Sequence, residues 1–249
     1  MQLNIRFKLV AGLFLIASVG VAQERTIASI VVIQPKEGMQ KQFDEGYKRH
    51  LEWHRKANDP WVWYGWQIVS GDRLFSFVDA TAGRAWEDFD GAVNPAGDAA
   101  DNAVNVMPYA NFVSRAFYEL QSGVSSSRLL EEHKPSPVVD WSYYDIYPGK
   151  EKEFAMLLRS CHEALQKAGS AQSYTWYKLV TGGDEPAYLL MAPMGKISDI
   201  RAATVSPLEA WVTLLPQRES EQLAERIRST VRGITTETLR YRADMSIVN

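Results

Sequence analysis

The stretch Trp61-Val62-Trp63-Tyr64-Gly65-Trp66-Gln67-Ile68-Val69-Ser70-Gly71-Asp72 decides the fold of this chain. Its aromatic and β-branched residues are typical of a strand, and the closing Gly-Asp predicts a tight turn into a return strand. A related stretch comes back as Tyr174-Thr175-Trp176-Tyr177-Lys178-Leu179-Val180-Thr181-Gly182-Gly183-Asp184. Pairing Val69 with Val180 gives an offset of 111 (180 minus 69), and the same offset pairs Phe43 with Phe154. Two landmarks at one offset indicate an internal duplication.

Both copies have the same predicted order of elements. The first copy reads as a strand at 27–33, a helix at 39–57, a hairpin at 61–79, an interrupted helical region at 81–106 and a strand at 111–120. The second copy repeats this order from the strand at 138–147 to the strand at 236–247. Such a β-α-β-β-α-β order is the ferredoxin-like unit. Its sheet carries helices on one face only, so two tandem units are expected to cover each other sheet to sheet.

With these elements the chain resembles the dimeric α+β barrel superfamily, in a single-chain tandem form similar to NIPSNAP-like and antibiotic-biosynthesis-monooxygenase-like proteins. The resemblance covers nearly all of residues 27–249 and rests on the element order and the duplicated hairpin. It implies an α+β fold of two ferredoxin-like repeats packed as an intramolecular barrel. We expect the repeats at 23–122 and 138–249, joined by a polar linker at 123–137. The superfamily includes cofactorless monooxygenases, muconolactone isomerases and haem-binding relatives of chlorite dismutase, and no signature motif places the chain among them.

The N-terminal segment predicts export. Arg6 and Lys8 precede an apolar run at 9–19, and the small residues Gly20 and Ala22 occupy the −3 and −1 positions of a cleavage site. This pattern is typical of a secretory signal peptide at 1–22, and it predicts a periplasmic or extracellular protein. An uncleaved membrane anchor is the alternative, but the apolar run is shorter than the roughly 20 residues that a spanning helix needs.

Charge and cysteine content exclude several classes of partner. Without residues 1–22 the chain has 25 basic and 30 acidic residues, a formal charge of −5, because Arg6 and Lys8 leave and no acid does. A mildly acidic protein without a basic stripe does not favour nucleic acid or an anionic membrane surface. The single cysteine, Cys161, cannot form an internal disulfide and falls in an apolar helical stripe. A homodimer is an open alternative, because unpaired sheet edges of the tandem repeats can pair with a second copy of the chain.

His50 and His54 are the first candidates for chemistry. Their i, i+4 spacing places both imidazoles on one face of the helix at 39–57, a spacing that can bind a metal. Position 51 is Leu, so the His-Glu-x-x-His motif of metalloproteases is absent. The offset of 111 sets Cys161 and Leu165 opposite them, which favours histidines packed beneath the sheet. A ligand or general-base role is the alternative, and no metal site is assigned.

The aromatic strands supply the second set of candidates. Alternation along the first hairpin strand places Trp63 and Gln67 on one face of the strand and Tyr64 on the other. Polar side chains on a covered face need hydrogen-bond partners or a ligand. A pocket lined by Trp and Tyr with a few polar groups fits a planar apolar molecule. The candidate ligand-binding residues are Trp63, Tyr64, Gln67, Tyr143, Asp145, Trp176 and Lys178.

The acidic and amide residues near the second helical region, Asp98, Asp101 and Asn102, are interpreted as helix capping and solvation. Their spacing is not that of an EF-hand loop.

Taken together, the sequence features support binding of a small apolar or aromatic ligand in a cavity of the barrel. The alternatives are a cofactorless monooxygenase or isomerase with a histidine base and, more weakly, haem binding through a histidine. Otherwise no cofactor is expected.

Overall fold

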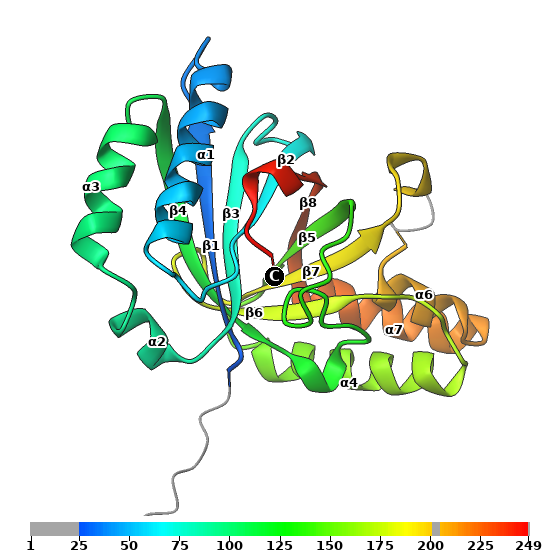
Figure 1. Ribbon diagram of the computed structural model, residues 1–249. Helices are drawn as coiled ribbons and strands as arrows, with labels where there is room; N and C mark the ends of the chain where they lie inside the picture. The colour runs from blue at the N-terminus through cyan, green and yellow to red at the C-terminus, as the bar shows by residue number, and fades with distance from the viewer. Residues whose placement is uncertain (1–24, 201–204, 249) are drawn as a thin grey trace, which may run out of the picture.

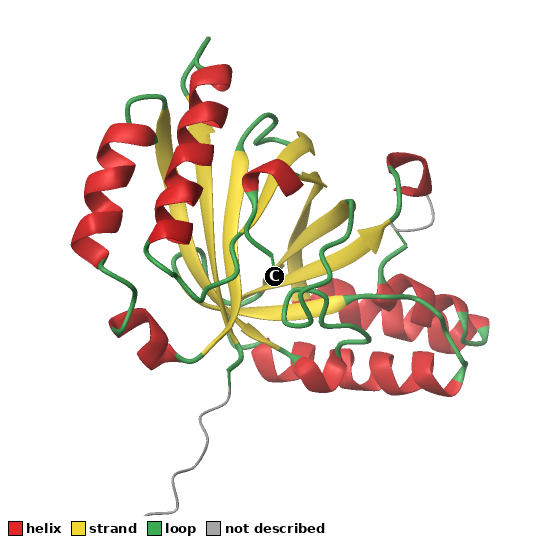
Figure 2. Cartoon of the chain, in the orientation of Figure 1, coloured by secondary structure: helices red, strands yellow, loops and turns green. Residues whose placement is uncertain are grey.

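The computed structural model describes residues 25–200 and 205–248 (Figures 1 and 2). The predicted signal peptide at 1–22 lies outside the described residues. Within the described part of the chain, no helix combines the length and the apolar character needed to cross a membrane.

Eight antiparallel strands form a closed barrel, in the order β1-β3-β2-β8-β5-β7-β6-β4. The first half of the chain supplies β1 to β4, and the second half supplies β5 to β8. The two four-stranded sheets join where β2 pairs with β8 and where β4 pairs with β6. The strands are β1 (Ile27–Pro35), β2 (Tyr64–Ser70), β3 (Phe77–Arg84), β4 (Ala110–Leu120), β5 (Val138–Ile146), β6 (Thr175–Thr181), β7 (Ala187–Met194) and β8 (Val231–Tyr241).

The helices lie on the outside of the barrel, one group for each half, as Figure 1 shows. The first group is α1 (Gln40–Lys56), α2 (Trp86–Asp90) and α3 (Pro95–Asn105). The second group is α4 (Glu151–Lys167), α6 (Pro207–Thr213) and α7 (Gln217–Thr230). Three short 3₁₀ turns complete the described elements, at η1 (Ser122–Val124), η2 (Ile197–Asp199) and η3 (Ala243–Met245). The tandem α+β barrel expected from the duplicated hairpin is confirmed.

The duplication holds at the level of single residues. Helices α1 and α4 begin at an offset of 111 (151 minus 40) and end at the same offset (167 minus 56). The strand register repeats as well, since Val32 pairs with Val78 in one half and Tyr143 with Leu189 in the other, again at this offset. Residues related in this way therefore occupy equivalent places, and differences between them show what each half does beyond folding.

Bulky side chains occupy the interior of the barrel. Alternation along the first hairpin turns Val62, Tyr64, Trp66 and Ile68 inward, where each is buried. Trp66 packs on Trp141 from the other sheet, with ring centroids 6.0 Å apart. Trp61 and Trp63 consequently point outward, to the side that carries the helices of the first half.

The C-terminal segment fixes this outward side of the first hairpin. The Ile247 carbonyl accepts a hydrogen bond from Trp63 N at 2.8 Å, and Ser246 Oγ accepts one from Gly65 N at 2.9 Å. Position 65 has no room for a side chain, because a Cβ there would lie 2.3 Å from the Met245 carbonyl oxygen. The end of the chain therefore holds Trp63 in place.

Candidate functional site

A cavity of about 560 Å³ lies outside the barrel, between the outer face of the first sheet and the helices α1 and α3. Its floor comes from β1, β3 and β4, whose outward residues include Val31, Asp79 and Arg115. Aromatic and aliphatic side chains form most of its wall, and imidazole, carboxylate and amide groups gather at the α1–α3 side. The wall residues are Val31, Ile33, Trp61, Trp63, Phe89 and Phe112.

Helix α1 carries both candidate histidines into this cavity. His50 and His54 are only 6% and 5% exposed, and they lie one turn apart on the face that packs toward the sheet. The question left open by the sequence, whether these histidines reach a cavity or are sealed in the core, is answered by their place on its lining.

Helix α3 brings a second set of polar groups against α1. The helix starts where Asn94 Oδ1 accepts a hydrogen bond from Gly97 N at 3.1 Å and Pro95 takes the first helical position. Its approach depends on Gly46 of α1, where a Cβ would lie 1.9 Å from the Asn105 carbonyl oxygen. With the two helices this close, the first turns of α3 face the histidines.

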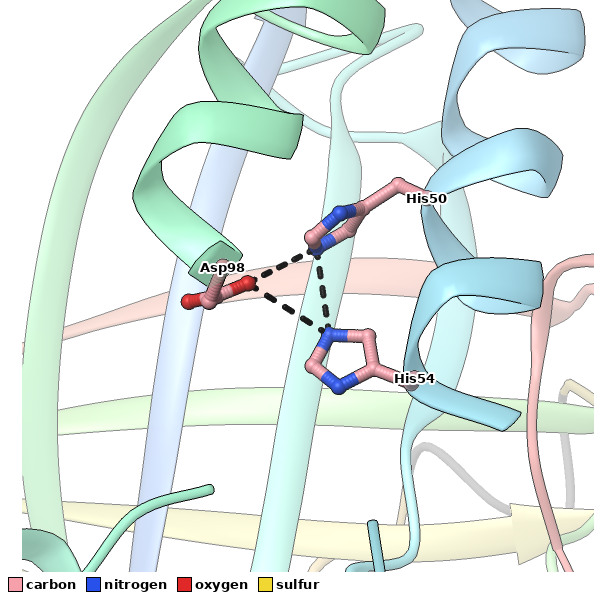
Figure 3. A group of neighbouring side chains, drawn as sticks. All are labelled: His50, His54 and Asp98. Carbon is pink, nitrogen blue, oxygen red and sulfur yellow. Dashed lines mark hydrogen bonds and ion pairs between the residues drawn. The ribbon is translucent and has the colours of Figure 1, made fainter. Parts of the chain in front are cut away.

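Three ligand-type atoms converge at the polar end of the cavity (Figure 3). His50 Nε2 lies 3.1 Å from His54 Nε2 and 3.3 Å from Asp98 Oδ1, and His54 Nε2 lies 3.7 Å from the same oxygen. The Asn102 amide nitrogen lies 3.1 Å from both His50 Nε2 and Asp98 Oδ1. No metal site was predicted from the sequence, because Asp98 belongs to a different helix and was interpreted as a capping residue.

A carboxylate orients each imidazole from behind. His50 Nδ1 lies 2.8 Å from Asp101 Oδ2, and His54 Nδ1 lies 2.7 Å from Asp59 Oδ2. Because a carboxylate only accepts, each Nδ1 carries the proton and donates it, which leaves both Nε2 lone pairs facing the cavity. Burial lowers the pKa of His50, and the hydrogen bond to Asp101 only partly opposes this effect.

Asp59 is itself held by the aromatic stretch that follows it. Trp61 N donates to its Oδ1 at 2.9 Å, and Trp63 Nε1 donates to its Oδ2 at 3.0 Å. Burial raises the pKa of Asp59, but the hydrogen bonds from His54, Trp61 and Trp63 outweigh it and hold that pKa below its usual range. Trp63 is therefore both a wall of the cavity and part of the support of His54.

Asp79 on β3 is a further titratable group on the cavity lining. Its Oδ1 is buried and has no hydrogen-bond partner among the described residues. Burial raises the pKa of Asp79 to about 7, against an opposing interaction with the Tyr47 hydroxyl. The exposed Arg115 guanidinium donates to Ser29 Oγ at 3.1 Å, and among the described residues that line the cavity Arg115 is the one arginine or lysine.

Of the seven residues predicted to bind a ligand, only Trp63 lines the cavity. Tyr64 and Tyr143 point into the filled barrel, and Trp176 is buried in the core of the second half. Asp145 is partly exposed beside Arg232, at 3.7 Å, while Gln67 and Lys178 are partly buried on their strands. The expectation of a cavity inside the barrel is corrected here, because large aromatic side chains from both sheets fill that interior.

The interpretation of Asp98, Asp101 and Asn102 as capping and solvation is also corrected. All three contact His50, and Asp98 and Asn102 line the cavity. Asp59 and Asp79 were not singled out at all. Sequence spacing shows which residues share one helix face, but it does not show which face of α3 meets α1, so the role of Asp98, Asp101 and Asn102 had no signal in the sequence.

The second half provides an internal comparison for this site. At the offset of 111, Cys161 stands for His50, Leu165 for His54 and Leu190 for Asp79, and all three are at most 3% exposed. The same framework therefore folds with apolar side chains at these positions. The polar groups of the first half are not a requirement of the fold.

Haem does not fit this arrangement. A haem iron takes its axial ligands from opposite faces of a planar macrocycle. The two Nε2 atoms instead lie 3.1 Å apart and point at a common position shared with Asp98. A macrocycle at either histidine would displace the other histidine and the carboxylate.

Comparisons with known proteins agree with the fold. No family profile matches the sequence, and no curated protein matches it. Solved structures do match over most of their length. A candidate monooxygenase from Lactobacillus acidophilus is 9% identical, with a TM-score of 0.57 over 90% of this chain and 97% of that one. An anthrone oxidase-like protein is 10% identical, with a TM-score of 0.53 over 88% and 92%. A mutant chlorite dismutase from Candidatus Nitrospira defluvii is 7% identical, with a TM-score of 0.54 over 90% and 94%. At these identities the likeness establishes the dimeric α+β barrel fold.

Proposed function

We propose that this protein binds a small, planar and largely apolar molecule in the cavity of its first half, with an oxygen-bearing or acidic end of that molecule at His50 and His54. The observation that carries the proposal is the division of the cavity into an aromatic wall and one polar end. Small-molecule sites are typically concave, mostly apolar and furnished with a few placed polar groups. A volume of about 560 Å³ accommodates a molecule of one to three rings.

The wall and the rim of the cavity both favour an aromatic ligand with an oxygen substituent. Trp61 and Trp63 stack with ring centroids 5.8 Å apart, and both line the cavity, where they supply aromatic surface to a bound ring. The buried Asp79 Oδ1 lacks a donor, so a ligand hydroxyl can supply one. Arg115 at the rim suits a carboxylate or a phenolate that projects from the cavity.

A test uses a panel of small hydroxylated aromatic acids, with saturated ring analogues for comparison. Binding is measured by ligand-observed NMR and by quenching of tryptophan fluorescence. Ala92→Trp fills part of the cavity from the loop between α2 and α3, and we expect it to weaken binding by about tenfold or more. Ala155→Trp, on the exposed side of α4, is the matched control and should leave binding unchanged. Equal binding to wild type and Ala92→Trp would overturn the proposal.

Acid–base catalysis on the bound molecule is the second candidate, and one feature favours it. The Asp59–His54 and Asp101–His50 pairs orient both imidazoles with Nε2 unprotonated and on the cavity side, which is the arrangement of a general base. A histidine acting as base works in the presence of a chelator, since it needs its lone pair free of metal. Proton abstraction that survives chelation and disappears in His54→Leu would support this candidate.

We further propose that the protein is exported after cleavage between Ala22 and Gln23, on the strength of the N-terminal pattern. Intact-mass measurement of the protein from its native host tests this directly. A mature chain that begins at Gln23 agrees with the proposal, and a chain that retains residues 1–22 contradicts it.

A further inference from the structure

The hydrogen bonds around His50 and His54 leave an excess of lone pairs between them. Each Nδ1 donates its proton to a carboxylate, Asp101 for His50 and Asp59 for His54. A neutral imidazole has one proton, so neither Nε2 carries one. The unprotonated Nε2 atoms of the two histidines then lie 3.1 Å apart in a buried setting.

Asp98 increases this excess. Its Oδ1 lies 3.3 Å from His50 Nε2 and 3.7 Å from His54 Nε2, so a third acceptor closes the same triangle. The Asn102 amide nitrogen is within 3.1 Å of His50 Nε2 and of Asp98 Oδ1, but it does not serve His54 Nε2. Among the described residues no donor reaches His54 Nε2. Acceptors packed in this way need a positive charge between them.

The size of the triangle matches the coordination sphere of a transition metal. Bonds of about 2.0–2.2 Å from one ion to two imidazole nitrogens and one carboxylate oxygen place these atoms roughly 2.8–3.6 Å apart in tetrahedral or octahedral geometry. The three separations of 3.1, 3.3 and 3.7 Å lie at this scale. The carboxylates behind each histidine complete the carboxylate–histidine–metal arrangement that fixes the tautomer of metal-bound imidazoles.

We propose that His50 Nε2, His54 Nε2 and Asp98 Oδ1 bind one divalent transition-metal ion, of the zinc, iron(II) or cobalt(II) class. The inference deepens the proposed function, on which it rests for its location at the polar end of the ligand cavity. Three protein ligands leave coordination positions open on the cavity side, where an oxygen of a bound molecule or a water completes the sphere. The Asp98 side chain, 39% exposed, gives the ion a path from solvent.

Comparison with the second half of the chain indicates that packing of the core does not require the cluster of His50, His54 and Asp98. Cys161 and Leu165 stand where His50 and His54 stand, and they are buried in a core without such an acidic partner from the facing helix. Burying two histidines requires a hydrogen-bond partner for each of them, and here each has its own carboxylate beside a third that they share. Two apolar residues fill the equivalent space in the second half without any of these partners.

Cobalt(II) is the probe of choice, because its visible absorption reports both binding and geometry. Metal-free protein, prepared with a chelator that is then removed, is titrated with Co²⁺ and the bound Co²⁺ is then displaced with Zn²⁺. We expect one equivalent of Co²⁺, visible absorption bands and displacement by Zn²⁺. His54→Leu and Asp98→Asn should each weaken Co²⁺ binding by on the order of 100-fold or more, since the first removes a direct ligand and the second replaces an anionic ligand with a neutral amide.

Two controls keep the outcome decisive. Asp145→Asn changes an equally exposed carboxylate of the second half and should leave the titration unchanged. Thermal unfolding of each variant shows that it is folded, and Asp98→Asn tests the site even if His54→Leu is unstable. Absence of a one-to-one Co²⁺ signal, or a signal that persists in both ligand variants, would overturn the metal site.

The metal site and the ligand cavity fail in distinguishable ways. If Co²⁺ does not bind while the aromatic acids still bind the wild type and not Ala92→Trp, the metal site is refuted and the cavity stands. If Co²⁺ binds at one equivalent and no aromatic acid binds with or without it, the proposed ligand class is refuted and the metal site stands.

Discussion

Leu165 occupies in α4 the place that His54 occupies in α1, at the offset of 111 that relates the two halves, and both residues are at most 5% exposed. The same buried position is therefore filled by a hydrocarbon side chain in the second half and by an imidazole that donates to Asp59 in the first half. The comparison shows that the barrel fold does not require a histidine at this position.

His54→Leu copies the residue of the second half into the first. We expect it to keep the free energy of unfolding of the metal-free protein within about 1 kcal/mol of wild type, because an apolar residue suits this buried position and Asp59 keeps its bonds from Trp61 and Trp63. Urea denaturation monitored by circular dichroism measures this. A loss of several kcal/mol would show instead that the histidine is a structural element of the core.

Asp101 acts on the site through His50 and is a positioning residue. Asp101→Ala removes the acceptor of the His50 Nδ1 proton at 2.8 Å, so the ring loses its fixed tautomer and orientation. We expect Co²⁺ binding about 10–100-fold weaker, still at one equivalent, with Asp101→Asn intermediate because an amide oxygen can accept the same proton. A change confined to stability, with Co²⁺ affinity and spectrum unaltered, would assign Asp101 a structural role only.

The fold could be predicted from the sequence to a large extent, and the site only in part. The tandem barrel could be predicted from the aromatic hairpin and its copy at an offset of 111. Strands and helices follow local sequence patterns, and the duplication repeats these patterns in the second half. His50 and His54 were found because two residues on one helix share a face. Asp79 and Asp98 were not recognised as site residues, since their proximity to the histidines depends on how β3 and α3 pack against α1, which no local pattern encodes. Asp59 was also not recognised, although it follows His54 by only five residues.

The position of the cavity could not be predicted for a related reason. Alternation along a strand separates two faces, and it did separate Trp63 from Tyr64 correctly. It does not say which of the two faces is filled. Trp66 and Trp141 fill the barrel interior, whereas the side chains of α3 leave space above the first sheet.

Asp79 should make the stability of the metal-free protein depend on pH. Burial raises the pKa of Asp79 to about 7, while an aspartate in the unfolded chain titrates near pH 4 (about 3.9). Between these values the folded protein holds a proton that the unfolded chain has released, so the free energy of unfolding falls as the pH rises from about 4 to about 7. The contribution is up to about 4 kcal/mol.

Denaturant unfolding of wild type and Asp79→Asn across this pH range, with a chelator present, isolates the contribution of Asp79. The variant should lose this part of the decline, because an amide does not titrate. Parallel pH profiles for the two proteins would contradict the assignment.

Gly46 sets the distance between α1 and α3. Gly46→Ala places a Cβ against the Asn105 carbonyl, so the helices must separate and Asp98 and Asp101 must move away from His50. We expect a net loss of about 1–3 kcal/mol in the free energy of unfolding, even though alanine is the better helix former. Gly123→Ala is the control and should be neutral, because an added Cβ there would meet no atom within 4 Å beyond its chain neighbours. Unchanged stability and Co²⁺ affinity in Gly46→Ala would show that the helices do not need this contact.

The most direct test of the central claim is anomalous X-ray diffraction from crystals of the protein grown with one equivalent of Zn²⁺ and measured at the zinc absorption edge. We expect a single anomalous peak within about 2.0–2.2 Å of His50 Nε2, His54 Nε2 and Asp98 Oδ1, with its remaining coordination facing the cavity. An empty triangle beside a zinc ion bound elsewhere, or the absence of any anomalous peak at these three residues, would contradict it.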